Sequence, residues 1–207
     1  MHTDKRIALF SLLFLGLSLA TFSQEKAMKP YFSGGISPIA PLSEGWDFSA
    51  SRHYRKFSLT LIFRGGFRSE GGGILDQMFE TYETVRLDIN HTLAFNPRYH
   101  FFHKKGVNYG PYIGGLLAYE TWTIQSRATT TLGQEEEKGN PYAGFNVGYI
   151  WYPNLKRKKN PRFFVDAYMH FIWKLDETES QVVGDQNYQI RTFAITRLPT
   201  IHLGYRF

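Results

Sequence analysis

The stretch Ile201-His-Leu-Gly-Tyr-Arg-Phe207 alternates apolar and polar residues with the period of two that is typical of a half-buried strand. The alternation extends back to Arg191, and only Arg197 and Leu198 clearly interrupt it. An amphipathic strand at the end of a chain would leave a sheet edge open to aggregation, whereas a strand that closes a cylinder has no such edge. The stretch therefore predicts the closing strand of a β-barrel.

The N-terminal residues have the pattern of a secretory signal peptide. Lys5 and Arg6 precede an apolar run over residues 7–20, and Thr21-Phe22-Ser23 supplies the small residues of a cleavage site before Gln24. The apolar run is shorter than the roughly 20 residues that a spanning helix needs. We expect residues 1–23 to be removed after export by the Sec route, which leaves residues 24–207 as one barrel domain.

Composition narrows the class of protein. The chain has no cysteine, so it has no disulfides, no thiolate metal sites and no lipoprotein site. Its 18 Phe and 13 Tyr suit strands better than helices. The net charge of +6 is compatible with nucleic-acid binding, but export and the distribution of charge along the chain argue against that partner.

Alternation along the mature chain predicts an all-β fold, an eight-stranded antiparallel up-and-down transmembrane β-barrel. The fourth strand is the clearest, because Leu87, Ile89, Leu93 and Phe95 form one face against a polar one. The expected strands are 30–38, 46–54, 57–68, 82–102, 109–125, 141–153, 162–176 and 189–207.

The connections between these strands alternate in charge. Short segments around residues 54–56, 103–106 and 154–160 are basic, whereas the longer segments 69–81, 126–140 and 177–188 are acidic. Outer-membrane barrels have short periplasmic turns and long extracellular loops. We therefore expect the basic turns in the periplasm and the acidic loops outside the cell.

Aromatic residues are expected at the two rims, where their rings would lie at headgroup level. The periplasmic rim comprises Tyr99, Phe101, Trp151, Phe163, Tyr205 and Phe207. The outer rim comprises Trp46, Trp122, Trp173 and Phe193.

The chain resembles the small outer-membrane β-barrel proteins of Bacteroidota, which share the architecture of the OmpA transmembrane domain and of the OmpX and OmpW barrels. The resemblance rests on Phe22-Ser23-Gln24, Asn96-Pro-Arg-Tyr99, Gly110-Pro-Tyr-Ile-Gly114 and Leu203-Gly-Tyr-Arg-Phe207. It implies location in the outer membrane and insertion by the barrel-assembly machinery with periplasmic chaperones. It also implies that Tyr205 and Phe207 act as the assembly signal.

At eight strands, side chains are large enough to fill the interior of a barrel. Alternation assigns a network of polar and ionisable side chains to the lumen: Arg64, Arg68, Arg86, Asp88, Arg98, Glu120, Asp166, His170, Lys174, His202 and Arg206. Charges facing each other in a narrow interior must pair or be desolvated at high cost. The favoured interpretation is a lumen filled by paired side chains, and the alternative is a narrow path for a small anion.

No catalytic, cofactor or metal site is expected. His91 faces outward by alternation, and the strand serines do not combine with a histidine and an acid as nucleophilic catalysis requires. His100, His170 and His202 point inward, but their spacing does not match a metal site.

The sequence thus predicts a non-enzymatic barrel surrounded by outer-membrane lipid. Its role would be structural, or exerted on an extracellular ligand by loops 126–140 and 177–188, because rigid scaffolds carry variable function on loops. A secreted, soluble lipocalin-like barrel is a more distant alternative, because that fold has an apolar interior and a helix after its barrel.

Overall fold

The computed structural model describes residues 29–69, 85–126, 135–156, 161–175, 180–183, 186–189, 193–195 and 200–207. The predicted signal peptide lies outside these residues. A short 3-10 helix, η1, spans Ala40–Ser43. The strands are β1 Tyr31–Ile36, β2 Trp46–Tyr54, β3 Phe57–Ser69, β4 Val85–Lys104, β5 Val107–Ser126, β6 Glu135–Trp151, β7 Phe163–Lys174, β8 Ser180–Val183, β9 Gln186–Gln189, β10 Phe193–Ile195 and β11 Thr200–Arg206.

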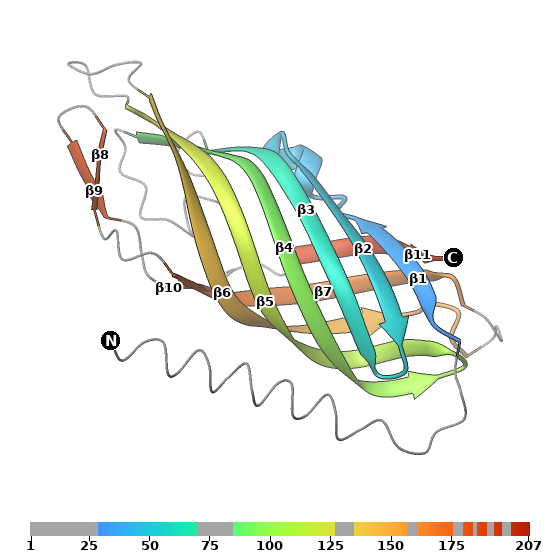
Figure 1. The fold of residues 1–207 in the computed structure, drawn as a ribbon. Helices are drawn as coiled ribbons and strands as arrows, with labels where there is room; N and C mark the ends of the chain where they lie inside the picture. The colour runs from blue at the N-terminus through green and yellow to red at the C-terminus, as the bar shows by residue number, and fades with distance from the viewer. Residues whose placement is uncertain are drawn as a thin grey trace, which may run out of the picture.

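The main sheet closes on itself. Each of β1 to β6 pairs with its neighbour in the chain, β6 pairs with β7, and β11 lies between β7 and β1. The segments β10 and β11 both pair with β7, so together they occupy the eighth position. The chain is a closed, eight-stranded antiparallel β-barrel, as the alternation predicted (Figure 1).

Two connections differ from the expectation. The segment 177–188, expected to be a loop, contains β8 and most of β9, which form a separate two-stranded sheet. The segment 126–140, also expected to be a loop, is shortened because β6 begins at Glu135 and its acidic residues continue the ladder with β5. Here β4, β5 and β6 continue the sheet together towards the loop end, so acidity did not mark the end of this strand.

The two ends of the barrel differ in their connections. One end, here called the turn end, carries the two-residue turns Arg55–Lys56 and Lys105–Gly106. Lys105 and Gly106 both have positive φ, 54° and 75°, as the tight hairpin turns that match strand twist require. The opposite end, here called the loop end, carries η1 and the connections from β3 to β4, β5 to β6 and β7 to β10.

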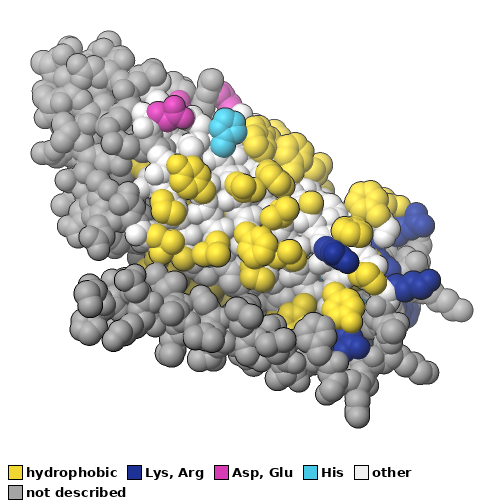
Figure 2. Space-filling view, viewed as in Figure 1, with side chains coloured by type: hydrophobic (Ala, Val, Ile, Leu, Met, Phe, Trp, Pro, Cys, Tyr) yellow, Lys and Arg dark blue, Asp and Glu magenta, His cyan; other side chains and the backbone are white. Residues whose placement is uncertain are grey.

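The outer wall of the barrel is apolar. Large hydrophobic side chains are exposed on it between the two ends, and no helix among the described residues is long and apolar enough to cross a membrane. Figure 2 shows them as a broad field across one face, with lysine and arginine gathered at the turn end. This apolar belt includes Phe32, Ile36, Phe48, Leu59, Leu61, Phe63, Leu93, Phe95, Ile113, Leu117, Tyr119, Phe145, Val147, Tyr149 and Leu203.

Six of the predicted rim aromatics are exposed, Tyr99 and Tyr205 are partly exposed, and the side chain of Phe193 lies outside the described part of the structure. Phe101, Trp151, Phe163 and Phe207 are exposed at the turn end, and Trp46 and Trp173 at the loop end. Trp122, expected in the outer rim, is only 3% exposed and faces the lumen. It follows Glu120 by two residues on β5, so the alternation that places Glu120 inside places Trp122 inside as well.

A β-bulge at Asn90 reverses the facing of β4 near the loop end. Ile89 pairs with Trp122 and His91 pairs with Thr121, so Asn90 is an extra residue on its strand. Ile89 is consequently buried although its place in the alternation pointed outward. Asp88, expected in the lumen, pairs with Thr123 and lies on the outer face. A bulge shifts the alternation by one residue, which explains both differences.

Candidate functional site

An ion pair lies at the middle of the lumen. Arg98 Nη1 on β4 is 2.6 Å from Asp166 Oδ2 on β7, and both side chains are almost completely buried. The Tyr112 hydroxyl donates to the other carboxylate oxygen of Asp166 at 2.8 Å. The guanidinium carbon of Arg98 lies 4.7 Å from the ring centre of Tyr112 and 5.2 Å from that of Tyr168. The cation is therefore paired with a carboxylate and flanked by two aromatic rings, which favours its burial.

Two asparagines extend this cluster across the sheet. The side-chain amides of Asn96 and Asn146 exchange hydrogen bonds of 3.0 Å, and Arg98 Nε donates to Asn96 Oδ1 at 2.5 Å. Asn96 also donates to the carbonyl of Gly115. Gly115 lies opposite Pro97, which has no N–H, so the Asn96 amide supplies the bond that the proline cannot give. The motif Asn96-Pro-Arg-Tyr99 thus contributes directly to the lumen.

A second cluster lies nearer the loop end, around Asp47. Its carboxylate is 3.5 Å from Arg64 Nη2 and 3.0 Å from His202 Nε2. The other ring nitrogen of His202 is 2.9 Å from Ser49 Oγ, and the Tyr168 hydroxyl lies 3.3 Å from His202 Nε2. The cluster therefore joins β2, β3, β7 and β11.

The sequence analysis did not identify Asp47 as a lumen residue. On β2, Asp47, Ser49, Ser51 and His53 recur at every second position, against Trp46, Phe48 and Ala50. That alternation was the available signal for the inward face of this strand. The partner histidine lies 155 positions away in sequence, so the pairing itself required the fold.

Ser49, His202 and Asp47 form a serine–histidine–aspartate arrangement, which the sequence analysis did not expect. Its connectivity is the reverse of a hydrolase triad. Here the serine is hydrogen-bonded to Nδ1 of the histidine and the aspartate to Nε2, whereas a triad has the serine at Nε2 and the acid at Nδ1. Asp47 is shared with Arg64. A Cβ at Gly35 would lie 2.9 Å from Ser49 Oγ, so this hydroxyl packs against the barrel wall. These contacts describe a structural hydrogen-bond chain.

Histidines and tyrosines occupy the turn end of the lumen. The ring of His53 stacks on Tyr31 at 4.2 Å and bonds to Ser33 at 2.8 Å, while His100 bonds to Ser58 at 2.8 Å. The backbone N–H of Asn108 on β5 donates to the Tyr31 hydroxyl on β1 at 3.0 Å. The last bond crosses the interior, because β1 and β5 lie on opposite sides of the barrel.

Three of the six remaining predicted lumen residues also face inward. Glu120 accepts a 2.7 Å hydrogen bond from Thr92, His170 is buried, and the Arg206 guanidinium lies 4.4 Å from the ring centre of Tyr31. The side chains of Arg68, Arg86 and Lys174 lie outside the described part of the structure. Of the described residues, no group of histidine, aspartate and glutamate has the geometry of a metal site.

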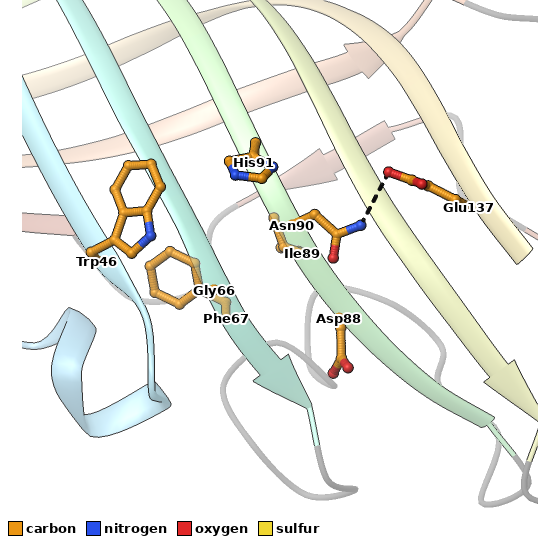
Figure 3. Close-up of a pocket in the computed structure, with 8 residues that line it drawn as sticks. All are labelled: Trp46, Gly66, Phe67, Asp88, Ile89, Asn90, His91 and Glu137. Carbon is orange, nitrogen blue, oxygen red and sulfur yellow. Dashed lines mark hydrogen bonds between the residues drawn. The ribbon is translucent and has the colours of Figure 1, made fainter. Parts of the chain in front are cut away.

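A hollow of about 380 Å³ lies on the outer wall beside the bulge. Figure 3 labels the residues that line it, which come from β2, β3, β4 and β6. Asn90 Nδ2 donates to Thr123 Oγ1 at 2.8 Å and lies 3.5 Å from Glu137 Oε1. The residues that line this wall hollow are Trp46, Gly66, Phe67, Asp88, Ile89, Asn90, His91 and Glu137.

The sequence matches no family model, and no curated protein matches it. Among solved structures, the fold is similar to Neisserial surface protein A, with 13% sequence identity and a TM-score of 0.47. That match covers 88% of this chain and 98% of the other. The attachment invasion locus protein Ail of Yersinia pestis is 14% identical with a TM-score of 0.40, and covers 88% of this chain and 100% of its own.

Proposed function

We propose that this chain is an integral outer-membrane β-barrel with a sealed lumen, and that it acts at the cell surface through the segments at its loop end. The apolar belt is the observation that carries the membrane assignment. A soluble barrel would have to expose this whole wall to water, whereas a bilayer solvates it favourably. Exposed aromatic residues near both ends fit the two interfaces.

The sealed lumen is inferred from bonds between buried polar side chains at three levels of the interior. Asn108 joins Tyr31 at the turn end and Arg98 joins Asp166 in the middle, both between walls that are at least three strands apart. Nearer the loop end, Asp47 on β2 bonds to Arg64 on the adjacent strand and to His202 on β11, beyond β1. An ion path would have to break these pairs and leave buried charges uncompensated. A structural or surface role is therefore favoured over the narrow anion path, and a non-enzymatic role over a hydrolase.

The polar interior also opposes the lipocalin-like alternative. A carrier of apolar ligands needs a largely apolar cavity, whereas this lumen contains a buried ion pair and several buried histidines and asparagines.

Orientation follows from charge. Lys104, Lys105, Lys156 and Arg162 are exposed at the turn end, and we assign that end to the periplasm and the loop end to the exterior. The proposed partners are outer-membrane lipid around the belt, and the barrel-assembly machinery with periplasmic chaperones during insertion. An extracellular ligand would bind at segments 126–140 and 177–188.

Fractionation tests the membrane assignment, and epitope tags test orientation. The protein should partition with outer membranes and migrate faster in unheated than in heated detergent gels. A tag at Gln134 should be labelled on intact cells, and a tag at Lys158 only after permeabilisation. Recovery in the soluble periplasmic fraction would overturn the proposal, and the reverse labelling would overturn the orientation. Planar-bilayer recordings should show no steady conductance, whereas anion-selective steps would favour the channel.

A further inference from the structure

The wall hollow combines carboxylates with aromatic rings at the edge of the apolar belt, and this combination suits a positively charged ligand. Asp88 and Glu137 bring acidic groups from β4 and β6, while Trp46 and Phe67 contribute rings from β2 and β3 (Figure 3). An ammonium group is attracted both by carboxylates and by the faces of aromatic rings, and tryptophan is the best of these.

The hollow is continuous with the apolar belt. His91 on β4 pairs with Gly65 on β3, and two residues further along both strands Leu93 pairs with Phe63. Leu93 and Phe63 are 53% and 41% exposed. Figure 2 shows the same succession on the surface, with histidine and acidic side chains bordering the hydrophobic field. A molecule with a charged head in the hollow could therefore lay an apolar tail along the belt.

The bulge at Asn90 is the reason that the Asp88 carboxylate lies at the hollow. In an uninterrupted ladder Ile89 would face outward and Asp88 inward, so the belt would continue towards the loop end. The extra residue instead places Asp88 on the outer wall and leaves Ile89 paired with buried Trp122. On β3, Gly66 lies beside this bulge with a φ of 72°. Bulges commonly re-aim side chains at functional sites.

Close packing around Gly65 holds the hollow in shape. A Cβ at Gly65 would lie 2.3 Å from the Asn90 carbonyl oxygen and 2.8 Å from the Trp46 ring, so only glycine fits there. The Trp46 ring is 6.2 Å from His91 between ring centres. Asn90 is in turn held by Thr123 and Glu137. The site is therefore built from side chains that fix one another.

We propose that the wall hollow binds the ammonium headgroup of an amine-bearing lipid of the outer leaflet, with the acyl chains on Leu93 and Phe63. This inference rests on the proposed function, because the hollow opens on the wall that we place in the membrane. A lipid reaches such a wall by lateral diffusion, whereas a soluble amine must approach it through the headgroup region.

Native mass spectrometry tests the proposal on the full mature barrel in nanodiscs of phosphatidylethanolamine and phosphatidylglycerol. The barrel should retain phosphatidylethanolamine preferentially when it is released from the disc. Asp88→Asn and Glu137→Gln should each reduce that preference by roughly fivefold, the factor that corresponds to the loss of about 1 kcal/mol from a partly exposed ion pair. Both substitutions keep side-chain size, so the hollow retains its shape.

Matched tryptophan variants provide the control. Trp46→Ala should weaken the preference and Trp46→Phe should restore part of it. Trp151→Ala, which removes an exposed tryptophan at the turn end, should leave the preference unchanged. Heat-modified migration of each variant verifies that the barrel is folded.

The outcomes separate the two proposals. A barrel that does not enter nanodiscs overturns the membrane assignment and this inference with it. A barrel that inserts but retains both lipids equally, or whose preference survives Asp88→Asn combined with Glu137→Gln, overturns only the headgroup site. Free ethanolamine that binds the detergent-solubilised barrel as tightly as the lipid does would overturn the assignment to a lipid.

Discussion

The guanidinium of Arg98 and the carboxylate of Asp166 meet inside the barrel, 2.6 Å apart, although β5 and β6 separate their strands in the sheet. The pair fixes the spacing of two walls at the middle of the lumen. Removal of either partner leaves a buried charge without compensation, which costs far more than loss of an exposed ion pair.

Asp166→Leu should therefore lower the free energy of unfolding by about 3–5 kcal/mol, measured by urea titration of the barrel in lipid vesicles. Asp88→Leu provides the control, because its bulge places it on the outer wall and its loss should cost about 1 kcal/mol or less. Arg98→Met combined with Asp166→Leu should recover part of the loss. Equal effects at Asp88 and Asp166 would show that Asp88 does not face the outer wall.

Leu203 tests the lipid-facing side of the closing strand. It is 48% exposed and pairs with Ile36 and Val165 on the outer wall. Leu203→Arg should cost roughly 2–4 kcal/mol if the site lies near the middle of the bilayer, and Phe207→Arg at the turn end about 0–1 kcal/mol. Thr200→Arg would instead place a charged side chain in the lumen. Unfolding in vesicles measures all three, and similar costs at Leu203 and Phe207 would place the bilayer elsewhere.

Gly114 lies where the asparagine amides approach the wall. A Cβ at this position would lie 2.3 Å from Asn146 Oδ1 and 2.9 Å from Asn96 Nδ2. Gly114→Ala should cost about 1–3 kcal/mol by overpacking. Gly34→Ala is the matched control, because its Cβ would have ordinary contacts of 3.6 Å and 3.7 Å. Thermal unfolding in detergent measures both, and equal stabilities would show that the Asn96–Asn146 pair can shift.

Ser49 separates a structural hydrogen bond from a catalytic one. Ser49→Ala removes the partner of His202 Nδ1 and should cost about 1–3 kcal/mol, the usual effect of an unsatisfied buried group. Because the hydroxyl packs against the wall, a fluorophosphonate probe should leave no adduct on the folded barrel. An adduct that disappears in Ser49→Ala would contradict the non-enzymatic assignment.

Deletion of Phe207 tests the predicted assembly signal. Its N–H donates to the carbonyl of Phe32 at 3.0 Å, and its side chain is exposed beside Tyr205. The loss of one backbone bond should leave the folded barrel nearly as stable, whereas insertion in cells should slow and unfolded mature protein should accumulate in the periplasm. Normal outer-membrane levels of the truncated protein would show that the terminal aromatic is not needed.

Period-two alternation predicted the closed barrel because facing in a strand depends on local sequence alone. The same rule placed Arg98, Asp166 and His202 correctly in relation to the wall. It failed for Asp88 and Ile89, because nothing in their neighbourhood signals an extra residue at Asn90. It also could not pair Ser49 or Asp47 with His202, because those contacts depend on which strands become neighbours when the sheet closes. Local sequence determines the side of the sheet on which a side chain lies, but it does not determine which side chain of another strand it contacts.

The hydrogen bond between Asn108 and Tyr31 has a consequence for folding kinetics. It connects residues 77 positions apart on opposite sides of the cylinder, so it can form only after the sheet has curled. The Arg98–Asp166 pair spans 68 positions in the same way. Native contacts of such long range form slowly and late. The β1–β11 seam that closes the barrel is itself short, because four residue pairs in the described part of the chain join the two strands. Before closure the polar face of an open sheet would lack its partners from the opposite wall. We therefore expect the bonds across the lumen to form last during folding. They must also break before β1 can separate from β11, so the barrel should unfold slowly.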